Sequence, residues 1–394
     1  MKYDFDKIID RKNTGCLKWD KAPKGLLPLW IADMDFATPD FAIDAIKARL
    51  NCPVLGYPII PKDYFPTIAR WVKHLHHWEV RPEWMCYVPG IVKGISLAQR
   101  LLLEKGETVI IQPPIYHPFR IVTQKNDLEV AYNPLIPICE DGRLTGYSMD
   151  FDDLEAKMAS GARMLLLSNP QNPSGQCWDR ETLGRVAELA VRYGVIVISD
   201  EIHGEMAHRG CEHIPFASVS EAAASCSISF MSPSKTFNIA GLVSSYAIVP
   251  DEGLRRRFFA MMEALELDYP SIFSIEATLA VYRHGTAWRR QMLRYVEGNI
   301  AFVDNYLRKY IPQIKALRPQ ASFLIWLDCR ELGLPQKQLM YFLKRRAGLF
   351  PNDGSMFGEQ GVGFVRINVG CPRSVLEKAL EQLRCAVEGL SEYK

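Results

Sequence analysis

The stretch SISFMSPSKTFNIAG, residues 227–241, joins a short strand-forming run to a turn that carries a lysine. Lys235 stands in this turn, with hydroxyl side chains close by at Ser232 and Ser234. An amine attacks a carbonyl carbon only when its proton affinity is lowered, and hydroxyls beside it help to hold an anionic group. The stretch makes Lys235 a candidate Schiff-base lysine beside a phosphate. Taken alone, a lysine between serines is ordinarily a solvated loop residue.

Five further apolar runs alternate with segments of helical pattern along the chain. They read ETVIIQPP, LEVAYNPL, ARMLLLSNP, VIVISDE and SYAIVP. Near-continuous apolar runs of this kind are typical of parallel strands that helices cover on both faces. We therefore expect all of them, SYAIVP included, to be parallel strands. The βαβα order predicts an α/β fold with a mostly parallel, doubly wound sheet in the larger of two domains.

Polar residues stand where several of these runs end. Asp200 follows a strictly apolar strand, where a carboxylate is costly unless a positive group faces it, and a protonated pyridine nitrogen is such a group. Asn172, in SNPQNPSG, offers a side-chain amide to a ring oxygen. In open α/β sheets the ligand lies outside the carboxyl ends of the strands. We expect Asn172, Asp200 and Lys235 to converge on one site.

Length and composition describe a globular protein that binds a small ligand. The chain has 394 residues, 48% of them hydrophobic and 23% charged, enough for two domains with their own cores. A net charge of +2 gives no field that favours nucleic acid or an anionic membrane. No apolar run approaches the roughly 18 residues of a membrane span, and the first residues lack an apolar signal core. We expect a cytoplasmic protein.

Cysteine and histidine spacing indicates no metal site. The ten cysteines include no CxxC pair, which argues against a structural zinc ion and against a disulfide scaffold. The local group of His74, His76 and His77 lies in a segment of helical pattern. We expect it to form a solvated or interface face rather than to bind a metal.

The pattern changes after residue 282, where long helices at 288–310 and 336–347 accompany two strands, ASFLIWLDC and GFVRINVGC. We predict a smaller α+β domain, residues 283–394, to which the N-terminal arm, residues 1–45, contributes. Residues 46–282 form the large domain. Within it, MCYVPGIVKGISLAQRLLL predicts a strand, a glycine turn and a helix whose N-terminus offers N–H groups to an anion.

Four motifs, NPQNPSG, DEIH, SPSKTFNIAG and GFVRINVGCPR, together resemble the fold-type I pyridoxal-phosphate enzymes of the class I/II aminotransferase superfamily. WIADMDFATP, the pair Gly56-Tyr57 and SKTFNIAGL are similar to the MalY/PatB-type cystathionine β-lyases within that superfamily. The similarity extends over essentially the whole chain. It implies pyridoxal 5′-phosphate as cofactor.

The resemblance implies roles around the cofactor ring. Lys235 forms the Schiff base, Asp200 pairs with the pyridine nitrogen, and Asn172 binds the ring hydroxyl oxygen with help from His203. Tyr116, in QPPIYHPF, stacks on the ring, although a loop aromatic at this place also suits a hydrophobic core.

It also implies a seat for the cofactor phosphate. Backbone N–H groups of Gly90, Ile91 and Val92 and the Ser232 hydroxyl hold the phosphate, and Tyr57 reaches it from a second subunit. The active sites are thus shared across a homodimer. The alternative for Tyr57 is that its proline-rich segment packs on its own domain.

On the substrate side, Arg366 grips the α-carboxylate in a bidentate pair, which a lysine could not copy. Asn172 and Asp33, of WIADMDF, are expected there too. The chain departs from many aminotransferases at Val243, where they carry an additional phosphate-binding arginine. This departure leaves more of the phosphate grip to backbone groups and to Tyr57.

The implied reaction is carbon–sulfur β-elimination from cystathionine or a related L-cysteine S-conjugate, with Lys235, Asp200 and Tyr57 as the catalytic residues. Two alternatives remain open. An aminotransferase would use the same residues, and a cofactor-containing regulatory protein would bind another protein and turn over sulfur amino acids only feebly.

Overall fold

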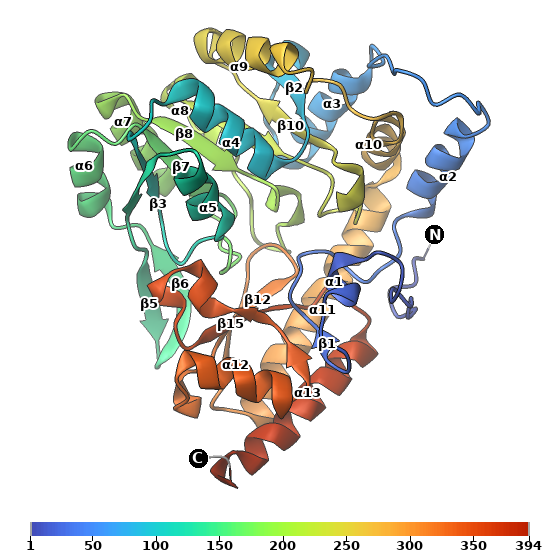
Figure 1. Ribbon diagram of the computed structural model, residues 1–394, viewed down its shortest axis with the longest axis vertical. Coiled ribbons are helices and arrows are strands. Elements are labelled where there is room, and N and C mark those ends of the chain that lie inside the picture. The colour runs from blue at the N-terminus through green and yellow to red at the C-terminus, as the bar shows by residue number, and fades with distance from the viewer. Residues whose placement is uncertain (1, 393–394) are drawn as a thin grey trace.

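Seven strands form the larger sheet of the computed structural model, which describes residues 2–392 (Figure 1). They are β2 (Met85–Val88), β3 (Thr108–Ile111), β4 (Glu129–Tyr132), β7 (Met164–Ser168), β8 (Ile196–Asp200), β9 (Ser227–Met231) and β10 (Ser245–Ile248). Their order across the sheet is β2-β10-β9-β8-β7-β3-β4. The neighbours from β9 to β4 are all parallel, which confirms the α/β class and the mostly parallel sheet.

The direction of one strand differs from the prediction. The run SYAIVP forms β10, which is antiparallel to both of its neighbours, β9 and β2. The connection from β9 to β10 contains only the short 3-10 helix η4 (Ala240–Leu242). A parallel return needs a crossover, usually an α-helix, and without one the chain turns back along the sheet. Apolar character alone did not distinguish the two directions.

Helices cover both faces of this sheet, as a doubly wound fold requires. Met164 and Leu166 of β7 pack toward one face, whereas Leu165 and Leu167 pack toward the other. The first face is covered by α4 (Ile91–Leu102), α5 (Pro118–Lys125) and α9 (Glu252–Ala264). The second is covered by α6 (Phe151–Ala159), α7 (Arg180–Tyr193) and α8 (Glu221–Ser225). Because successive side chains of a strand point to opposite faces, the apolar run is buried on both sides.

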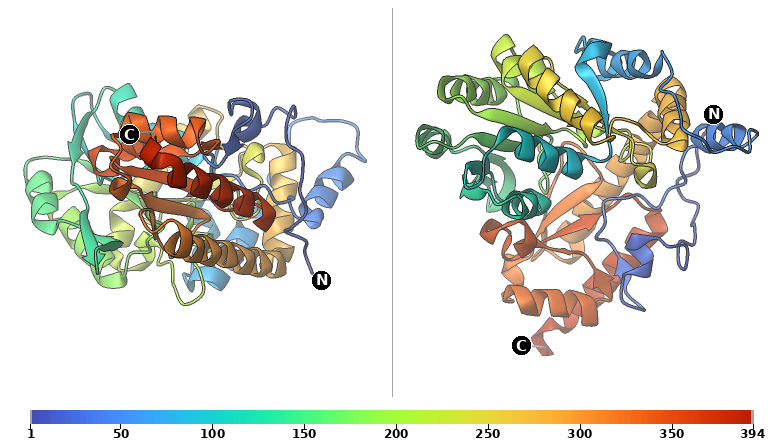
Figure 2. Two further views of the ribbon diagram at one scale, coloured as in Figure 1. Left: turned by 90° about the horizontal axis from the view of Figure 1, so that it is seen from below. Right: turned by 45° about the horizontal axis from the view of Figure 1, so that its top comes forward.

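A second, antiparallel sheet forms in the C-terminal third. Its order is β11-β12-β15-β14, with β11 (Lys315–Leu317), β12 (Leu324–Asp328), β14 (Asn352–Asp353) and β15 (Phe364–Asn368). Three helices accompany it, α11 (Thr286–Tyr310), α12 (Gln336–Arg345) and α13 (Arg373–Glu388). Figure 2 shows α11 and α13 side by side, and both pack into the same apolar core. The predicted strands and helices of this third are confirmed.

The N-terminal arm lies against this C-terminal third. It contains α1 (Leu17–Asp20) and β1 (Leu27–Pro28), and β1 pairs in parallel with β13 (Leu349–Phe350). The helices α2 (Asp40–Arg49) and α3 (Tyr64–His76) pack on α10 (Ile272–His284). Between β4 and α6 the chain forms an antiparallel hairpin of β5 (Ile136–Glu140) and β6 (Arg143–Ser148). The expected boundary at residue 282 falls in the last turn of α10, and the division into domains stays a proposal.

Membrane-spanning helices and metal sites were both expected to be absent. No helix within residues 2–392 has the length and apolar character to cross a bilayer. Over the same residues, no group of three or more His, Cys, Asp or Glu side chains is placed to hold a metal ion. The histidine group is only partly a solvated face: His74 and His77 are exposed, but His76 is buried with its ring centroid 5.0 Å from that of His213.

Candidate functional site

A cavity of about 270 Å³ lies at the carboxyl ends of the parallel strands. It meets the ends of β7 and β8, the turn after β9 and the N-terminus of α4. Eight of the predicted site residues line it, namely Gly90, Ile91, Val92, Tyr116, Asn172, Asp200, His203 and Lys235. The convergence expected from the strand ends is therefore what the structure shows.

Lys235 enters the cavity from the turn after β9. Its Nζ donates a hydrogen bond to the Ala32 carbonyl oxygen at 2.6 Å, and no carboxylate among the described residues pairs with it. Burial lowers the pKa of Lys235 to about 8, although the nearby Asp33 carboxylate opposes this shift. The amine is thus neutral in a useful fraction of molecules near neutral pH, which a nucleophile or base requires.

Asp200 ends β8, lines the same cavity and is 7% exposed. Its Oδ1 accepts a hydrogen bond from the Ile202 N–H at 3.1 Å, and no cation in residues 2–392 forms an ion pair with it. Burial raises the pKa of Asp200 to about 7, the Ile202 N–H opposes this, and repulsion by Glu201 adds to it. A carboxylate this deeply buried calls for a positive partner that the chain itself does not supply.

Arg366 lies on β15 and is 4% exposed. Its NH1 donates to Asn172 Oδ1 at 2.8 Å, and its NH2 donates to Asn352 Oδ1 at 2.6 Å. The guanidinium lies 5.0 Å from the centre of the Phe357 ring, and its Nε has no hydrogen-bond partner. Burial lowers the pKa of Arg366 to about 10. Its partners are neutral amides, so the positive charge remains available to an anion.

His203 and Tyr116 complete the wall. Burial lowers the pKa of His203 to about 3, so the imidazole is neutral, and its buried Nδ1 has no hydrogen-bond partner. Burial raises the pKa of Tyr116, which keeps its phenol protonated. Both rings are placed beside the cavity as predicted, and their contacts with a cofactor stay predictions.

The N-terminus of α4 closes one end of the cavity. Gly90 precedes the helix with φ +113°, a conformation that favours glycine, and its N–H donates to the Val88 carbonyl at 2.8 Å. The Gly90 N–H thus takes part in a tight turn, and its contact with an anion stays a prediction. The N–H groups of Ile91 and Val92 lie in the first helical turn, where no intrahelical acceptor exists. These two N–H groups, which we call the phosphate seat, stay the predicted anion-binding groups.

Besides Arg366, which contacts the cavity wall through Asn172, three predicted site residues do not line the cavity. Ser232 is buried, and its hydroxyl donates to the Ser244 carbonyl at 3.2 Å. The Asp33 carboxylate is held by Arg11, with 2.8 Å between Oδ2 and NH2. Tyr57 is fully exposed on the loop between α2 and α3, which extends away from the rest of the molecule in Figure 1. The roles assigned to these three stay predictions.

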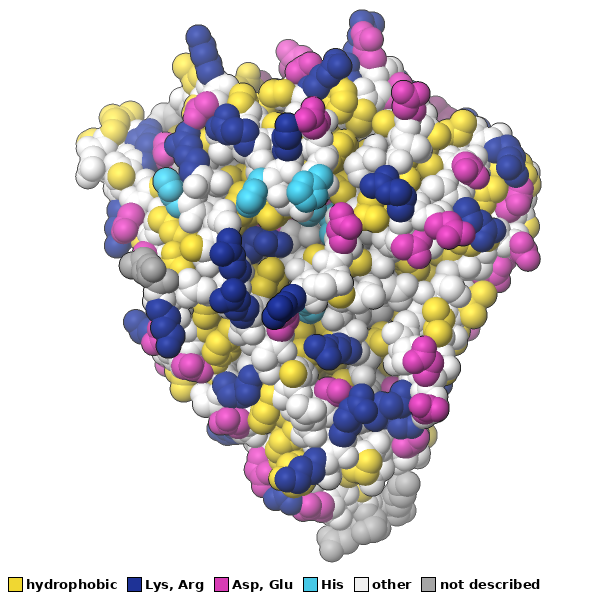
Figure 3. All heavy atoms as spheres, turned by 180° about the vertical axis from the view of Figure 1, so that it is seen from behind, with side chains coloured by type: hydrophobic (Ala, Val, Ile, Leu, Met, Phe, Trp, Pro, Cys, Tyr) yellow, Lys and Arg dark blue, Asp and Glu magenta, His cyan; other side chains and the backbone are white. Residues whose placement is uncertain are grey.

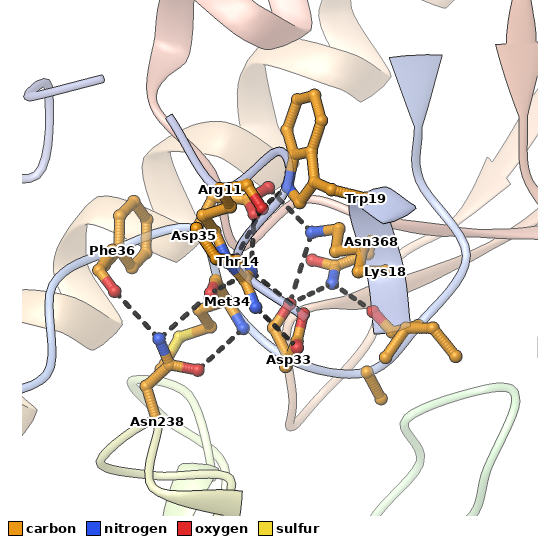
Figure 4. A network of polar contacts seen from close by, with 12 residues as sticks. Arg11, Thr14, Lys18, Trp19, Asp33, Met34, Asp35, Phe36, Asn238 and Asn368 are labelled. Carbon is orange, nitrogen blue, oxygen red and sulfur yellow. Dashed lines mark hydrogen bonds and ion pairs between the residues drawn. The ribbon is translucent and has the colours of Figure 1, made fainter. Parts of the chain in front are cut away.

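A cluster of charges lies in the N-terminal arm (Figure 4) and includes Asp33, next in the chain to Ala32 of the cavity wall. Arg11 pairs with both Asp33 and Asp35, and the fully buried Lys18 pairs with Asp35 at 2.7 Å. The Trp19 indole N–H also donates to Asp35 at 2.8 Å. Although burial favours a neutral carboxyl group, Lys18 and these hydrogen bonds lower the pKa of Asp35. We call these five residues the arm cluster.

Two asparagines fix the backbone of the arm segment, residues 30–36, of which Ala32 lines the cavity (Figure 4). Asn238 donates from Nδ2 to the Met34 carbonyl at 2.9 Å, and Asn368 donates from Nδ2 to the Asp33 carbonyl at 2.6 Å. Asn238 belongs to the stretch that carries Lys235, and Asn368 ends β15. The arm segment is therefore held by both sheets, which sets the Ala32 carbonyl against Lys235.

Sequence reasoning missed several residues that shape the site. Ala32 and Trp30 act through backbone carbonyls, which meet Lys235 and Arg366, and side-chain identity gives no sign of such contacts. Asn352 contacts Arg366 because β14 pairs with β15 in a register that no local pattern reveals. Lys93, in the first turn of α4, also lines the cavity, and its position in the predicted glycine turn and helix was the available signal.

The family model described as aminotransferase class I and II matches residues 24–383. The chain belongs to this family. Cystathionine beta-lyase PatB of Bacillus subtilis is 36% identical over 98% of the chain and 100% of its own length. Protein MalY of Escherichia coli is 33% identical, with the same coverage of 98% and 100%.

The crystal structure of cystalysin from Treponema denticola, which contains a pyridoxal 5′-phosphate cofactor, superposes with a TM-score of 0.94. It is 31% identical and covers 99% of this chain and 100% of its own. The resemblance to the MalY/PatB type and the fold-type I architecture of this aminotransferase-family chain are thus confirmed.

The cavity of this aminotransferase-family chain suits a pyridine ring that bears an aldehyde and a phosphate. The amine of Lys235 faces the same space as a buried carboxylate that has no cationic partner, Asp200. The first turn of α4 offers N–H groups to a phosphate at the other end. The unpaired Nδ1 of His203 remains for the polar edge of the ring.

Proposed function

We propose that this chain is a pyridoxal-phosphate-dependent carbon–sulfur β-lyase that acts on cystathionine or related L-cysteine S-conjugates. One observation carries the proposal. Lys235 and Asp200 line one cavity at the carboxyl edge of the sheet, Arg366 contacts Asn172 of its wall, and none of the three has an ionic partner among the described residues. Such a reaction needs three groups: an amine, a counter-ion for the ring nitrogen, and a cation that binds the substrate carboxylate.

The residues that would hold the cofactor divide into three groups. Lys235 binds its aldehyde carbon, and Asp200 holds a proton at its pyridine nitrogen. The N–H groups of Ile91 and Val92 bind its phosphate. When bound, pyridoxal phosphate supplies an electron sink for negative charge at the α-carbon of an amino acid. Val243 lies near Gly90 and adds no cation to the phosphate seat.

Lys235 acts as the general base. Its pKa, lowered by burial to about 8, lies close to the working pH, where general bases are most effective. Once the substrate amine displaces it, the ε-amine accepts the proton from the substrate α-carbon. The Ala32 carbonyl, 2.6 Å from Nζ, orients the amine at the edge of the cavity.

Arg366 selects the α-carboxylate of the substrate. Asn172 and Asn352 hold its two terminal nitrogens in place, so the planar fork is oriented before the substrate arrives. Its free Nε and its uncompensated charge favour a carboxylate over a neutral group. This contact fixes the amino acid with its α-carbon toward Lys235.

The overall reaction breaks the bond between the β-carbon and sulfur. The electron pair of that bond leaves with sulfur as a thiolate, which takes up a proton. For cystathionine and one water molecule, the products are homocysteine, pyruvate and ammonia. The cystathionine β-lyase named among the relatives supports this substrate class.

The test is turnover by the purified holoenzyme on a panel of cystathionine, cystine, cysteine and an S-alkyl conjugate. Pyruvate is measured with and without an added 2-oxo acid. The proposal predicts pyruvate from at least one substrate with no 2-oxo acid present. Turnover that requires a 2-oxo acid would make the chain an aminotransferase, and feeble turnover of all substrates at full cofactor occupancy would favour the regulatory role.

The active site is proposed to be shared between two copies of the chain. Tyr57 contacts nothing that would fix it in its own subunit, and its neighbours Val54, Leu55 and Ile59 are also largely exposed. Exposed apolar side chains grouped in this way are typical of a surface that a partner covers. A two-fold dimer would bring Tyr57 to the phosphate seat of the other subunit. A cytoplasmic location likewise stays a prediction.

Mixing two inactive variants tests the shared site. Tyr57→Ala and Lys235→Ala proteins are combined and allowed to exchange subunits. If Tyr57 acts across the interface, half of the dimers are mixed and each holds one intact site, so activity recovers to about one quarter of wild type. Proven exchange without recovery would place Tyr57 in its own subunit's site.

A further inference from the structure

A second hollow, a groove of about 530 Å³, lies outside the active site, between α11 and the segment that follows η2 (Gly204–Met206). Four arginines line it: Arg209 from the segment, and Arg289, Arg290 and Arg294 from α11. Arg290 and Arg294 are one helical turn apart and so share a face of the helix. Glu297 is the only acidic residue that lines the groove within residues 2–392.

The charges of these arginines are not neutralised within the described part of the chain. None of the four forms an ion pair there, whereas other surface arginines do, for example Arg192 with Glu155 at 2.8 Å. The Glu297 carboxylate accepts a hydrogen bond from the backbone N–H of Arg209 at 2.7 Å and so helps to fix the segment after η2. Figure 3 shows Lys and Arg side chains gathered near the middle of the face on which α11 lies.

The walls of the groove are held in place. His208 is buried, with its two ring nitrogens 3.0 and 2.6 Å from the carbonyl oxygens of Pro319 and Ser322. Arg289 donates from Nε to the Glu205 carbonyl oxygen, which leaves its terminal nitrogens for a ligand. Preorganised guanidinium groups lose little entropy when they bind an anion, because their orientation is already set.

We propose that this groove is a binding site for a small, multiply charged phosphate-bearing molecule, separate from the cofactor phosphate seat. Guanidinium groups match phosphate oxygens in bidentate geometry, and several of them around one groove match more than one phosphate. The whole chain carries a charge of only +2, so the positive field is local to the groove.

The experiment titrates inorganic tripolyphosphate into the holoenzyme, in which the cofactor phosphate seat is already taken, and follows the heat of binding. We expect saturable binding, one molecule per chain, that weakens with added salt. The double variant Arg290→Gln/Arg294→Gln removes two charges from exposed positions and should weaken binding about tenfold or more. Glu297→Gln keeps the acceptor for Arg209 but removes the negative charge, and should tighten binding.

The matched control is Arg345→Gln/Arg346→Gln, two exposed arginines on or next to α12 that remove the same charge from the chain. It should bind tripolyphosphate as wild type does. Absence of saturable binding to wild type, or equal loss in the control, would overturn the proposal. So would tighter binding of hexaglutamate than of tripolyphosphate, which would make the groove a docking site for an acidic protein segment. Unchanged thermal unfolding of each variant shows that the fold is intact.

Discussion

Two groups of buried or partly buried charges lie close together in this molecule and differ in how they are neutralised. In the arm cluster each charge has a partner in the same chain: the fully buried Lys18 meets Asp35 at 2.7 Å, and Arg11 pairs with Asp33 and Asp35. These contacts lower the pKa of Asp35 in spite of its burial. The charges of the arm cluster neutralise one another, and the cluster stabilises the fold of the N-terminal arm.

The cavity has the opposite character. Lys235 meets only a carbonyl, Asp200 only a backbone N–H, and Arg366 two amides and a carbonyl. Burial moves the pKa of Lys235 down to about 8 and that of Asp200 up to about 7, each toward its neutral form. Buried charge alone therefore does not indicate an active site. An active site is indicated by buried charge that has no compensating partner within the chain.

The largest expected effect is that of Lys235→Ala. Lyase activity should fall about 10⁴-fold or more, because both the covalent anchor and the general base are lost. The visible absorbance of the lysine-bound cofactor should disappear. Apoprotein stability should not fall, since the substitution removes an uncompensated buried charge. Lys93→Ala is the control: this lysine also lines the cavity, and its loss should leave the covalent bond intact.

Arg366→Lys comes next. We expect kcat/KM for the amino acid substrate to fall about 100-fold with cofactor absorbance retained, because an ammonium cannot form the bidentate pair. Steady-state kinetics on the best substrate of the panel measure this. An unchanged kcat/KM would mean that another group binds the α-carboxylate.

Asp35→Asn tests the arm cluster. The substitution keeps the shape but leaves the buried Lys18 ammonium without its counter-ion, so the free energy of unfolding should fall by about 3–5 kcal/mol. Denaturant unfolding measures it. Asp44→Asn is the matched control, because its pair with Lys47 is exposed, and it should change stability by less than about 0.5 kcal/mol. Equal effects of the two substitutions would erase the contrast between paired and unpaired charges.

The smallest effect concerns the pH dependence of the apoprotein. The folded state binds the Asp200 proton more tightly than the unfolded chain, because burial raises the pKa to about 7 from 3.8. This stabilisation is complete below the unfolded pKa and is lost as the pH rises through about 7. Between about pH 5 and about pH 8, wild-type apoprotein should therefore lose on the order of 2–3 kcal/mol more stability than Asp200→Asn. Parallel pH profiles would show that Asp200 is solvated or paired.

Much of the fold and of the site followed from the sequence because strand ends share one edge of a sheet. Asn172, Asp200 and Lys235 each follow an apolar run, and that local pattern was enough to bring them together. The antiparallel direction of β10 was not predictable, since it depends on what the connection contains rather than on the run itself. The contact of Lys235 with Ala32 depends on a carbonyl, which every residue type has in common.

We propose that the uncompensated charges of the cavity bind a cofactor that is attached to Lys235. Borohydride reduction of the holoenzyme, followed by peptide mapping, tests it most directly, because reduction makes the bond between lysine and cofactor permanent. We expect one labelled peptide, the one that contains Lys235. A label on another lysine, such as Lys93, or no label at full cofactor occupancy would contradict it.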